Sequence, residues 1–216
     1  MACRPPSLLP FPDLTLTFDN GPDPEATPRV LDVLAERGLK ATFFVVGEPL
    51  RAHRKLAERA VAEGHWIGNH TLTHPRPLGE ATDAVREIEA TQAEIGALAH
   101  PDRLFRPSGA GGELEPGLLS PDAVDALVDG DYTCVLWNAV PGDWKDPSGW
   151  VNRALAECSA RDWTLLVLHD VPGAAADRLA DFLDRAPVRF RQDFPPQCVP
   201  IRRGVIERPL NGLIAR

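Results

Sequence analysis

His70 and His74 are the first residues in this sequence whose types and spacing suggest chemistry. An interval of four residues would place both imidazoles on one side of a single helical turn, where together they could hold a metal ion. By itself such a pair is a weak signal, because histidines are more often structural or solvated than bound to metal. A metal site is therefore indicated only if other polar residues converge on this pair.

Other polar candidates lie at, or a few residues after, the ends of apolar runs that predict strands. The parallel strands of a barrel point their C-terminal ends at one mouth, where the connecting loops converge. Residues that are far apart in the chain can therefore meet there. The candidates with this placement are Asp19, His70, Arg106, Asp143 and His169.

Predicted strands and helices alternate along the chain, which favours an α/β fold with a mainly parallel sheet and the helices outside it. The strand patterns cover residues 14–18, 41–46, 65–68, 104–105, 132–137 and 164–168. The helical patterns cover residues 25–38, a segment through 53 and 60 that ends near 64, and residues 80–99, 121–128, 147–158 and 173–186.

The 216 residues, of which 44% are hydrophobic and 25% charged, are typical of a globular chain and predict one domain over residues 1–216. The formal net charge is −8 and no cluster of Lys and Arg is present in the sequence. Since affinity for nucleic acid depends on concentrated cationic side chains, we expect no nucleic-acid partner.

The four cysteines, Cys3, Cys134, Cys158 and Cys198, are far apart and form no C-x-x-C pair, which favours reduced, buried thiols. The N-terminus lacks the basic start and apolar core of a secretion signal, and no apolar run approaches the ~18 residues needed to span a bilayer. The sequence therefore predicts a cytoplasmic protein without a membrane segment.

Five short motifs stand out along the sequence: Thr17 to Pro22, Asn69 to His74, Arg106-Pro107, Asp143-Trp144 and Leu166 to Asp170. They occur in the same order as those of the polysaccharide deacetylases, the carbohydrate esterase family 4, which includes chitooligosaccharide and peptidoglycan N-deacetylases. The chain resembles this family over about residues 14–170. The resemblance implies a distorted (β/α) barrel of about seven parallel strands. It also implies a metal-dependent hydrolase that removes acetyl groups, N-acetyl foremost, from an amino sugar, oligosaccharide or polysaccharide.

The resemblance also implies roles for single residues. His70 and His74 look like ligands of a divalent metal, zinc foremost, with cobalt and nickel as the other candidates. Asp19 looks like the general base, and Arg106 like the arginine that keeps this carboxylate ionised. His169 looks like the general acid that protonates the leaving amine.

Substrate contacts are expected from two places. The glycine-rich stretch that contains Ser108 and Gly109 could bring backbone N–H groups close to a substrate, although a plain loop is an equal alternative. Trp144 is a candidate for stacking on a sugar, whereas Trp137 is expected to pack in the core. The expected partner is an acetylated carbohydrate, and the oligomeric state is not predicted.

The first motif departs from the family at Asn20, where an aspartate usually completes the metal site. Three interpretations follow, in this order: Asn20 ligates through its amide oxygen, Asp19 becomes the ligand, or the site holds no metal. Deamidation of Asn20 is a fourth, because Gly21 leaves the next backbone nitrogen free to attack the side-chain amide.

The third and fourth motifs depart from the family as well. Ser108 follows Arg106-Pro107 in place of the usual tyrosine, and Val140 replaces an aspartate before Asp143-Trp144. Asp143 is then either the acidic partner of His169 or, at least as readily, an ion-pair partner of Arg106. Two alternatives to the deacetylase remain: a hydrolase of a C–N bond in a non-sugar substrate, or a carbohydrate-binding relative with impaired catalysis.

Overall fold

The structure is a computed structural model that describes residues 11–109 and 111–214. In these two ranges, seven strands run parallel to one another: β1 (Asp13–Asp19), β2 (Thr42–Val45), β3 (Trp66–Asn69), β4 (Leu104–Phe105), β5 (Thr133–Cys134), β6 (Trp163–His169) and β7 (Arg189–Arg191). Two short antiparallel strands, β8 (Ile201–Arg202) and β9 (Val205–Ile206), extend the sheet beyond β5. The spatial order is β6-β1-β2-β3-β4-β5-β8-β9, and β7 pairs with the start of β1.

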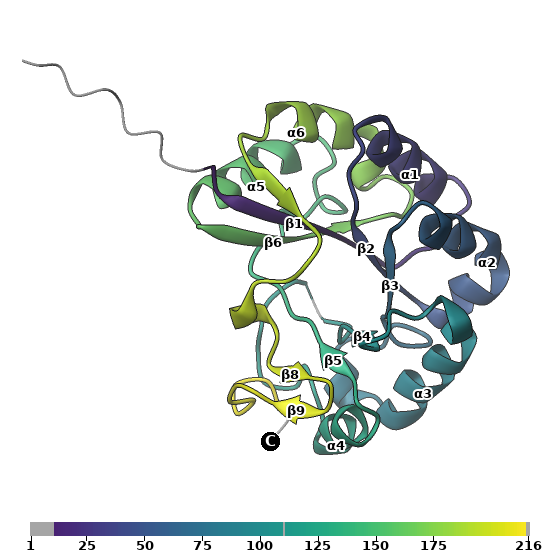
Figure 1. The fold of residues 1–216 in the computed structure, drawn as a ribbon. Coiled ribbons are helices and arrows are strands. Elements are labelled where there is room, and N and C mark those ends of the chain that lie inside the picture. Colours follow the sequence, from purple (N-terminus) through teal and green to yellow (C-terminus); the bar gives the residue numbers. More distant parts are fainter. Residues whose placement is uncertain (1–10, 110, 215–216) are drawn as a thin grey trace, which may run out of the picture.

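The sheet curls into a distorted barrel, because the chain that follows β5 returns to β6 (Figure 1). The backbone nitrogen of Val167 donates to the carbonyl of Ala139 at 3.0 Å, and the nitrogen of Asn138 donates to Leu165 at 3.4 Å. The α/β barrel that the sequence predicts is confirmed. Its seven parallel strands include β7, a strand that the sequence patterns missed together with β8 and β9.

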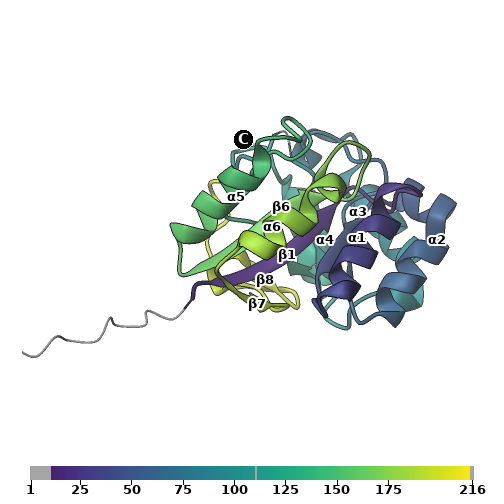
Figure 2. The same cartoon turned by 90° about the horizontal axis from the view of Figure 1, so that it is seen from above.

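Within the described residues, six α-helices cover the outside of the barrel: α1 (Ala26–Glu36), α2 (Gly47–Ala62), α3 (Ala84–Ile95), α4 (Pro121–Asp129), α5 (Trp150–Ser159) and α6 (Leu179–Arg185). Successive neighbours in this layer are α4, α3, α2, α1, α6 and α5 (Figure 1). Of these, α5, α6, α1 and α2 follow one another across the view from above (Figure 2). The helices expected over residues 80–99 and 173–186 are shorter, because 3₁₀ turns occupy Leu78–Glu80, Gly96–Leu98 and Ala175–Asp177.

Local sequence explains where two of these helices begin. Ser120 accepts a hydrogen bond from the nitrogen of Ala123 at 3.1 Å, and Pro121 occupies the first helical position of α4. Asp83 caps α3 in the same way by accepting from the nitrogen of Arg86 at 2.9 Å. Such caps satisfy N–H groups that have no partner within the helix, so they fix the lengths of the loops from β3 and β4.

The two-residue period of a strand decides which side chains enter the barrel. Leu14, Leu16 and Phe18 of β1 pack outward into the cluster that contains α1, α5 and α6. The alternate positions of β1, which end in Thr17 and Asp19, therefore face inward. Along β6, Leu166 and Leu168 likewise join the outer cluster, whereas Leu165 and Val167 join the inner one. His169 continues the inward-facing series.

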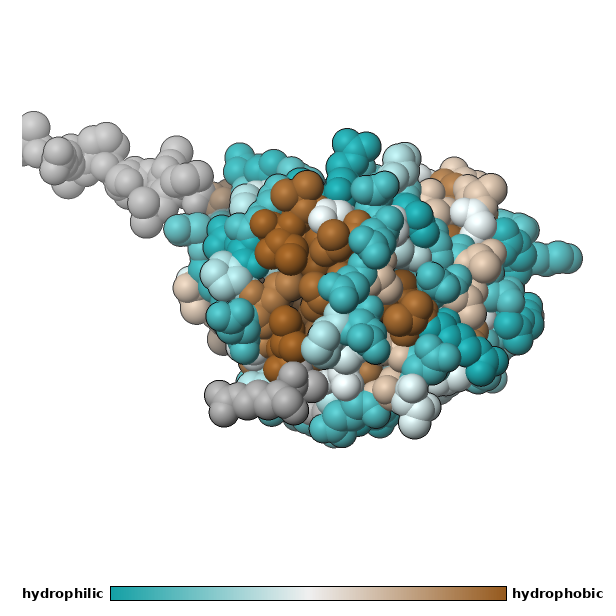
Figure 3. Space-filling model, turned by 90° about the horizontal axis from the view of Figure 1, so that it is seen from below, coloured by the Kyte–Doolittle hydropathy of each residue, from teal (hydrophilic) through white to brown (hydrophobic). Residues whose placement is uncertain are grey.

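The surface combines hydrophilic residues with an apolar patch that is visible from below (Figure 3). In the described part of the chain, no helix has the length and apolar character needed to cross a membrane. Cys134, Cys158 and Cys198 are buried and free, as expected, while Cys3 lies outside the described residues. Burial raises the pKa of the Cys134 thiol to about 12, so this group is a packing residue rather than a nucleophile.

Candidate active site

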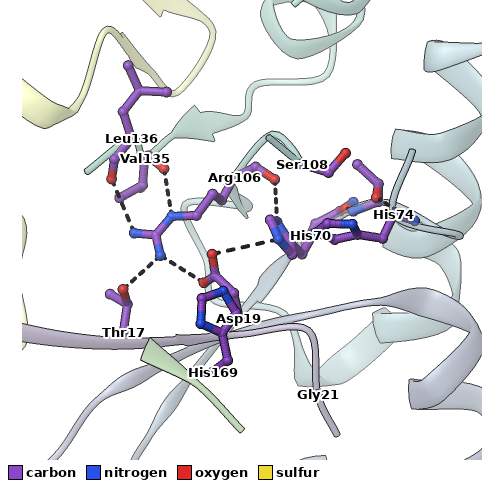
Figure 4. A network of polar contacts seen from close by, with 12 residues as sticks. Thr17, Asp19, Gly21, His70, His74, Arg106, Ser108, Val135, Leu136 and His169 are labelled. Carbon is purple, nitrogen blue, oxygen red and sulfur yellow. Dashed lines mark hydrogen bonds and ion pairs between the residues drawn. The ribbon is translucent and has the colours of Figure 1, made fainter. Parts of the chain in front are cut away.

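Asp19 and Arg106 form a buried ion pair at the C-terminal ends of β1 and β4 (Figure 4). Nη1 of Arg106 donates to Oδ1 of Asp19 at 2.8 Å and to Oγ1 of Thr17 at 2.7 Å. The other guanidinium nitrogens donate to the carbonyls of Val135 and Leu136, both at 3.1 Å. Arg106 has four hydrogen-bond acceptors around it and no exposed surface, so its ion pair with Asp19 differs from an ordinary ion pair at the surface. It fixes the orientation of the Asp19 carboxylate.

His70 follows β3 and presents one nitrogen to Asp19. Its Nδ1 lies 2.9 Å from the carbonyl oxygen of Arg106, and because a carbonyl only accepts, Nδ1 carries the proton. Burial lowers the pKa of His70, although the charge of Asp19 opposes this effect, so the ring is neutral and Nε2 is unprotonated. That nitrogen lies 3.6 Å from Oδ2 of Asp19, which leaves two electron-pair donors facing each other.

His74 reaches the same site through a loop, so the expected helical turn is wrong. Thr71 and His74 have positive φ angles of 70° and 58°, and the N–H groups of Leu72 and Thr73 donate to the Glu87 carboxylate on α3. These bonds hold the segment in a non-helical turn. The rings of His70 and His74 still lie together, with centroids 5.0 Å apart. Burial, followed by the neighbouring His70, lowers the pKa of His74 to about 3, so this ring is also neutral.

Asn20 supplies a third potential ligand atom. Its Oδ1 is buried and has no hydrogen-bond partner among the described residues. A buried oxygen without a partner is energetically costly unless a bound group satisfies it. No group of three or more His, Cys, Asp or Glu side chains suited to a metal occurs in the described chain. His70, His74 and the neutral oxygen of Asn20 line one cavity and are of the types that bind a divalent cation.

Asp170 holds the loop that carries Asn20, a role that the sequence patterns missed. Oδ1 of Asp170 accepts from the backbone nitrogen of Gly21 at 3.0 Å, and Oδ2 accepts from Oγ1 of Thr27 at 2.5 Å. A Cβ at position 21 would lie 2.1 Å from Oδ2 of Asp170, so only glycine fits there. Because the Gly21 nitrogen is held by this carboxylate, it is not free to attack the Asn20 amide, which argues against deamidation.

His169 pairs with Asp143. Its Nδ1 lies 2.8 Å from Oδ1 of Asp143, and its backbone nitrogen donates to Oδ2 at 2.8 Å. Burial alone would lower the pKa of His169, but the hydrogen bond and charge of Asp143 outweigh it and raise this pKa. The ion pair between Asp143 and Arg106, which the sequence left open, does not form, because Arg106 is fully engaged with Asp19.

One cavity of about 230 Å³ brings most of these side chains together. Its polar lining includes Asp19, Asn20, His70, His74 and His169, and Gly109, Trp137 and Trp144 lie in its walls. Trp144 is partly exposed, and its ring centroid lies 4.5 Å from that of His169. Trp137 is largely buried, as expected, and its Nε1 donates to the carbonyl of Gly112 at 2.6 Å.

Ser108 does not reach this cavity. It is fully buried, and its hydroxyl donates to the carbonyl of Pro75 at 2.6 Å. Its own carbonyl accepts from the nitrogen of Leu78 at 3.0 Å. The expected substrate contact through Ser108 is therefore replaced by a structural one, in which Ser108 ties the loop after β4 to the loop after β3.

The chain is similar to several deacetylases. The sequence pattern of the family described as polysaccharide deacetylase matches residues 9–114. A chitooligosaccharide deacetylase of Sinorhizobium fredii (strain NBRC 101917 / NGR234) is 37% identical over 174 residues, which cover 79% of this chain and 76% of that protein. A peptidoglycan-N-acetylglucosamine deacetylase of Bacillus cereus is 30% identical over 177 residues, which cover 80% of this chain and 61% of that protein.

A solved structure supports the same relationship. The family 4 acetyl xylan esterase from Clostridium thermocellum, solved in complex with a cobalt ion, superposes with a TM-score of 0.65 and 31% sequence identity, covering 83% of this chain and 87% of the other. The relatives are identical to this chain at about a third of the aligned positions over most of its length, and the solved structure has the same barrel. Both findings agree with the order of the five sequence motifs. The chain belongs to the polysaccharide deacetylase family of hydrolases.

Proposed function

We propose that this protein is a metal-dependent deacetylase that hydrolyses the N-acetyl group of an amino sugar in an oligosaccharide or polysaccharide. The observation that carries the proposal is the register of β1 and β6, which pairs Asp19 directly with His169 and places a carboxylate and an imidazole in one cavity. Hydrolysis of an amide needs a base for the attacking water and an acid for the leaving amine. The relatives with named chitooligosaccharide and peptidoglycan activities support the choice of substrate.

A divalent cation held by His70, His74 and Asn20 would act as a Lewis acid, lowering the pKa of a water and polarising the acetyl carbonyl. Asp19 accepts the proton of the attacking water, and Arg106 keeps its carboxylate oriented. As the C–N bond breaks, His169 donates a proton to the amine nitrogen, and acetate and the free amino sugar leave. Trp144 and Trp137 border the sugar.

Acetate release from N-acetylglucosamine oligomers, measured before and after removal of metal with a chelator, tests this proposal. We expect the stripped protein to be inactive, and zinc, cobalt or nickel to restore activity. The variant His70→Ala should lose the bound metal, measured by elemental analysis, because a two-ligand site is much weaker. Full activity in metal-free protein, or no acetate from any acetylated sugar with any of these ions, would contradict the proposal.

Asn20→Asp separates the deacetylase from a binding-only relative. A carboxylate adds a full negative charge to the ligand set, so we expect the variant to bind zinc about tenfold more tightly or better in calorimetry. Peptide mass spectrometry of the unsubstituted protein should show intact Asn20. If acetate release appears only in Asn20→Asp, the natural chain is a carbohydrate-binding protein with an impaired site.

Asp143→Asn should move the alkaline limb of the pH profile to lower pH. A general acid must be protonated, so the rate falls as pH rises through the pKa of His169. The negative charge of Asp143 raises that pKa, and its removal lets His169 lose its proton at lower pH. Profiles of kcat/KM between about pH 5 and 9 measure the shift. Asp146→Asn, an exposed carboxylate three residues away that pairs with Arg153, is the control and should leave the limb in place.

A further inference from the structure

Two cations border the cavity without an acidic partner. Arg76, in the loop between β3 and α3, lies in the cavity wall. Lys145, in the loop between β5 and α5, places its ammonium 5.1 Å from the Trp144 ring centroid and 3.6 Å from the position that a Cβ on Gly111 would take. Both Trp144 and Gly111 line the cavity, so Lys145 lies beside its wall, on a different loop from Arg76.

Two carboxylates of the site and one in the loop that carries Lys145 are already engaged. Asp19 is bound by Arg106, and Asp143 is bound by His169. Asp146, next to Lys145 in the chain, pairs instead with Arg153 at 2.8 Å. Within the described residues, neither Arg76 nor Lys145 forms an ion pair within 4.0 Å. Two cations without an ion-pair partner thus lie beside the cavity, on a chain whose net charge is −8.

The backbone at Arg76 is held in place. Pro75 and Pro77 flank it and restrict the backbone on both sides. The carbonyl of Pro75 accepts from the buried Ser108 hydroxyl at 2.6 Å, which fixes this loop to the loop that carries Gly109. Of the guanidinium nitrogens, Nε contacts Nδ1 of His74 at 3.4 Å, so the terminal nitrogens stay available.

We infer that the mouth of the cavity is a subsite for an oxyanion, a carboxylate or a phosphate, carried by the acetylated sugar or by the residue linked to it. The inference deepens the proposed function and rests on it for the position of the acetyl group. A guanidinium binds a planar carboxylate or a phosphate through two parallel hydrogen bonds, and an ammonium adds a second point charge. Because the chain as a whole is acidic, a local positive rim is what would admit an anionic substrate.

Binding and turnover test this subsite separately. N-acetylglucosamine, its carboxylate-bearing ether N-acetylmuramic acid, and N-acetylglucosamine 1-phosphate are titrated into the protein by calorimetry, in low and in high salt. Acetate release is then measured for neutral and carboxylate-bearing oligomers of the same length. We expect an anionic sugar to bind about tenfold more tightly at low salt, with the preference shrinking at high salt because both cations are exposed. The carboxylate and phosphate arms identify which oxyanion fits.

Arg76→Gln and Lys145→Gln should each reduce the ratio of anionic to neutral binding by about three- to tenfold, and the double variant should abolish it. Arg86→Gln and Lys55→Gln, which remove exposed cations that do not line the cavity, are the matched controls and should keep the ratio. Equal binding of neutral and anionic sugars, or a ratio unchanged in the double variant, overturns the inference while acetate release still stands. Selective binding without any acetate release would support the subsite and contradict the proposed catalysis.

Discussion

Asp19→Asn should lower kcat for acetate release by about 10²- to 10⁴-fold, because an amide cannot accept the proton of the attacking water. Oδ1 of the new side chain can still accept from Arg106, so the positions of His70 and Arg106 should change little. The loss should therefore appear in kcat, with a much smaller effect on substrate affinity. Steady-state kinetics on an N-acetylglucosamine oligomer, with bound metal quantified in each sample, measures it.

Asp13→Asn is a matched control for this variant. Asp13 lies at the opposite end of the same strand, is also buried, and is ion-paired with Arg189 and Arg191. Its replacement removes the same charge and breaks ion pairs at the opposite end of the strand, so kcat should stay close to that of the unsubstituted protein. If Asp19→Asn retained a comparable rate, Asp19 would not be the base.

Arg106→Leu should reduce the free energy of unfolding by about 3–5 kcal/mol at neutral pH, because it leaves the Asp19 carboxylate buried without its partner. It also removes the donor for Thr17 and for the carbonyls of Val135 and Leu136. The guanidinium also packs against the ring of Phe44, with 4.0 Å between its carbon and the ring centroid. Urea unfolding followed by circular dichroism gives the change.

The ion pair of Arg29 and Asp177 provides the comparison. Its atoms lie 2.7 Å apart, yet both side chains are 57% exposed, so Arg29→Ala should cost no more than about 1 kcal/mol. In the double variant Asp19→Asn/Arg106→Leu the buried charge is gone, and we expect less destabilisation than the sum of the two single variants, by about 0.5–3 kcal/mol. Strict additivity would show that Asp19 and Arg106 do not interact energetically.

The sequence predicted strands most accurately where one continuous segment is both buried and rich in apolar residues. In β1 and β6 the apolar residues and the polar residues that follow them marked the strands and placed Asp19 and His169 at their ends. The segments at β7, β8 and β9 are two or three residues long and include exposed or partly exposed positions. They therefore lack the fully buried apolar pair that marks the equally short β4. The proximity of His70 and His74 was expected from a helical turn, but a loop held by Glu87 produces it.

The sequence by itself determined the alternation of strands and helices, the C-terminal strand ends at which polar residues collect, and the family. Each of these can be recognised from local patterns or from the order of short motifs. Only the tertiary structure decided that Asp143 pairs with His169, that Ser108 is turned toward Pro75, and that the oxygen of Asn20 is buried without a partner. These outcomes depend on contacts between segments far apart in the chain. A side chain's partner is set by how loops close over the barrel, and no local period encodes that closure.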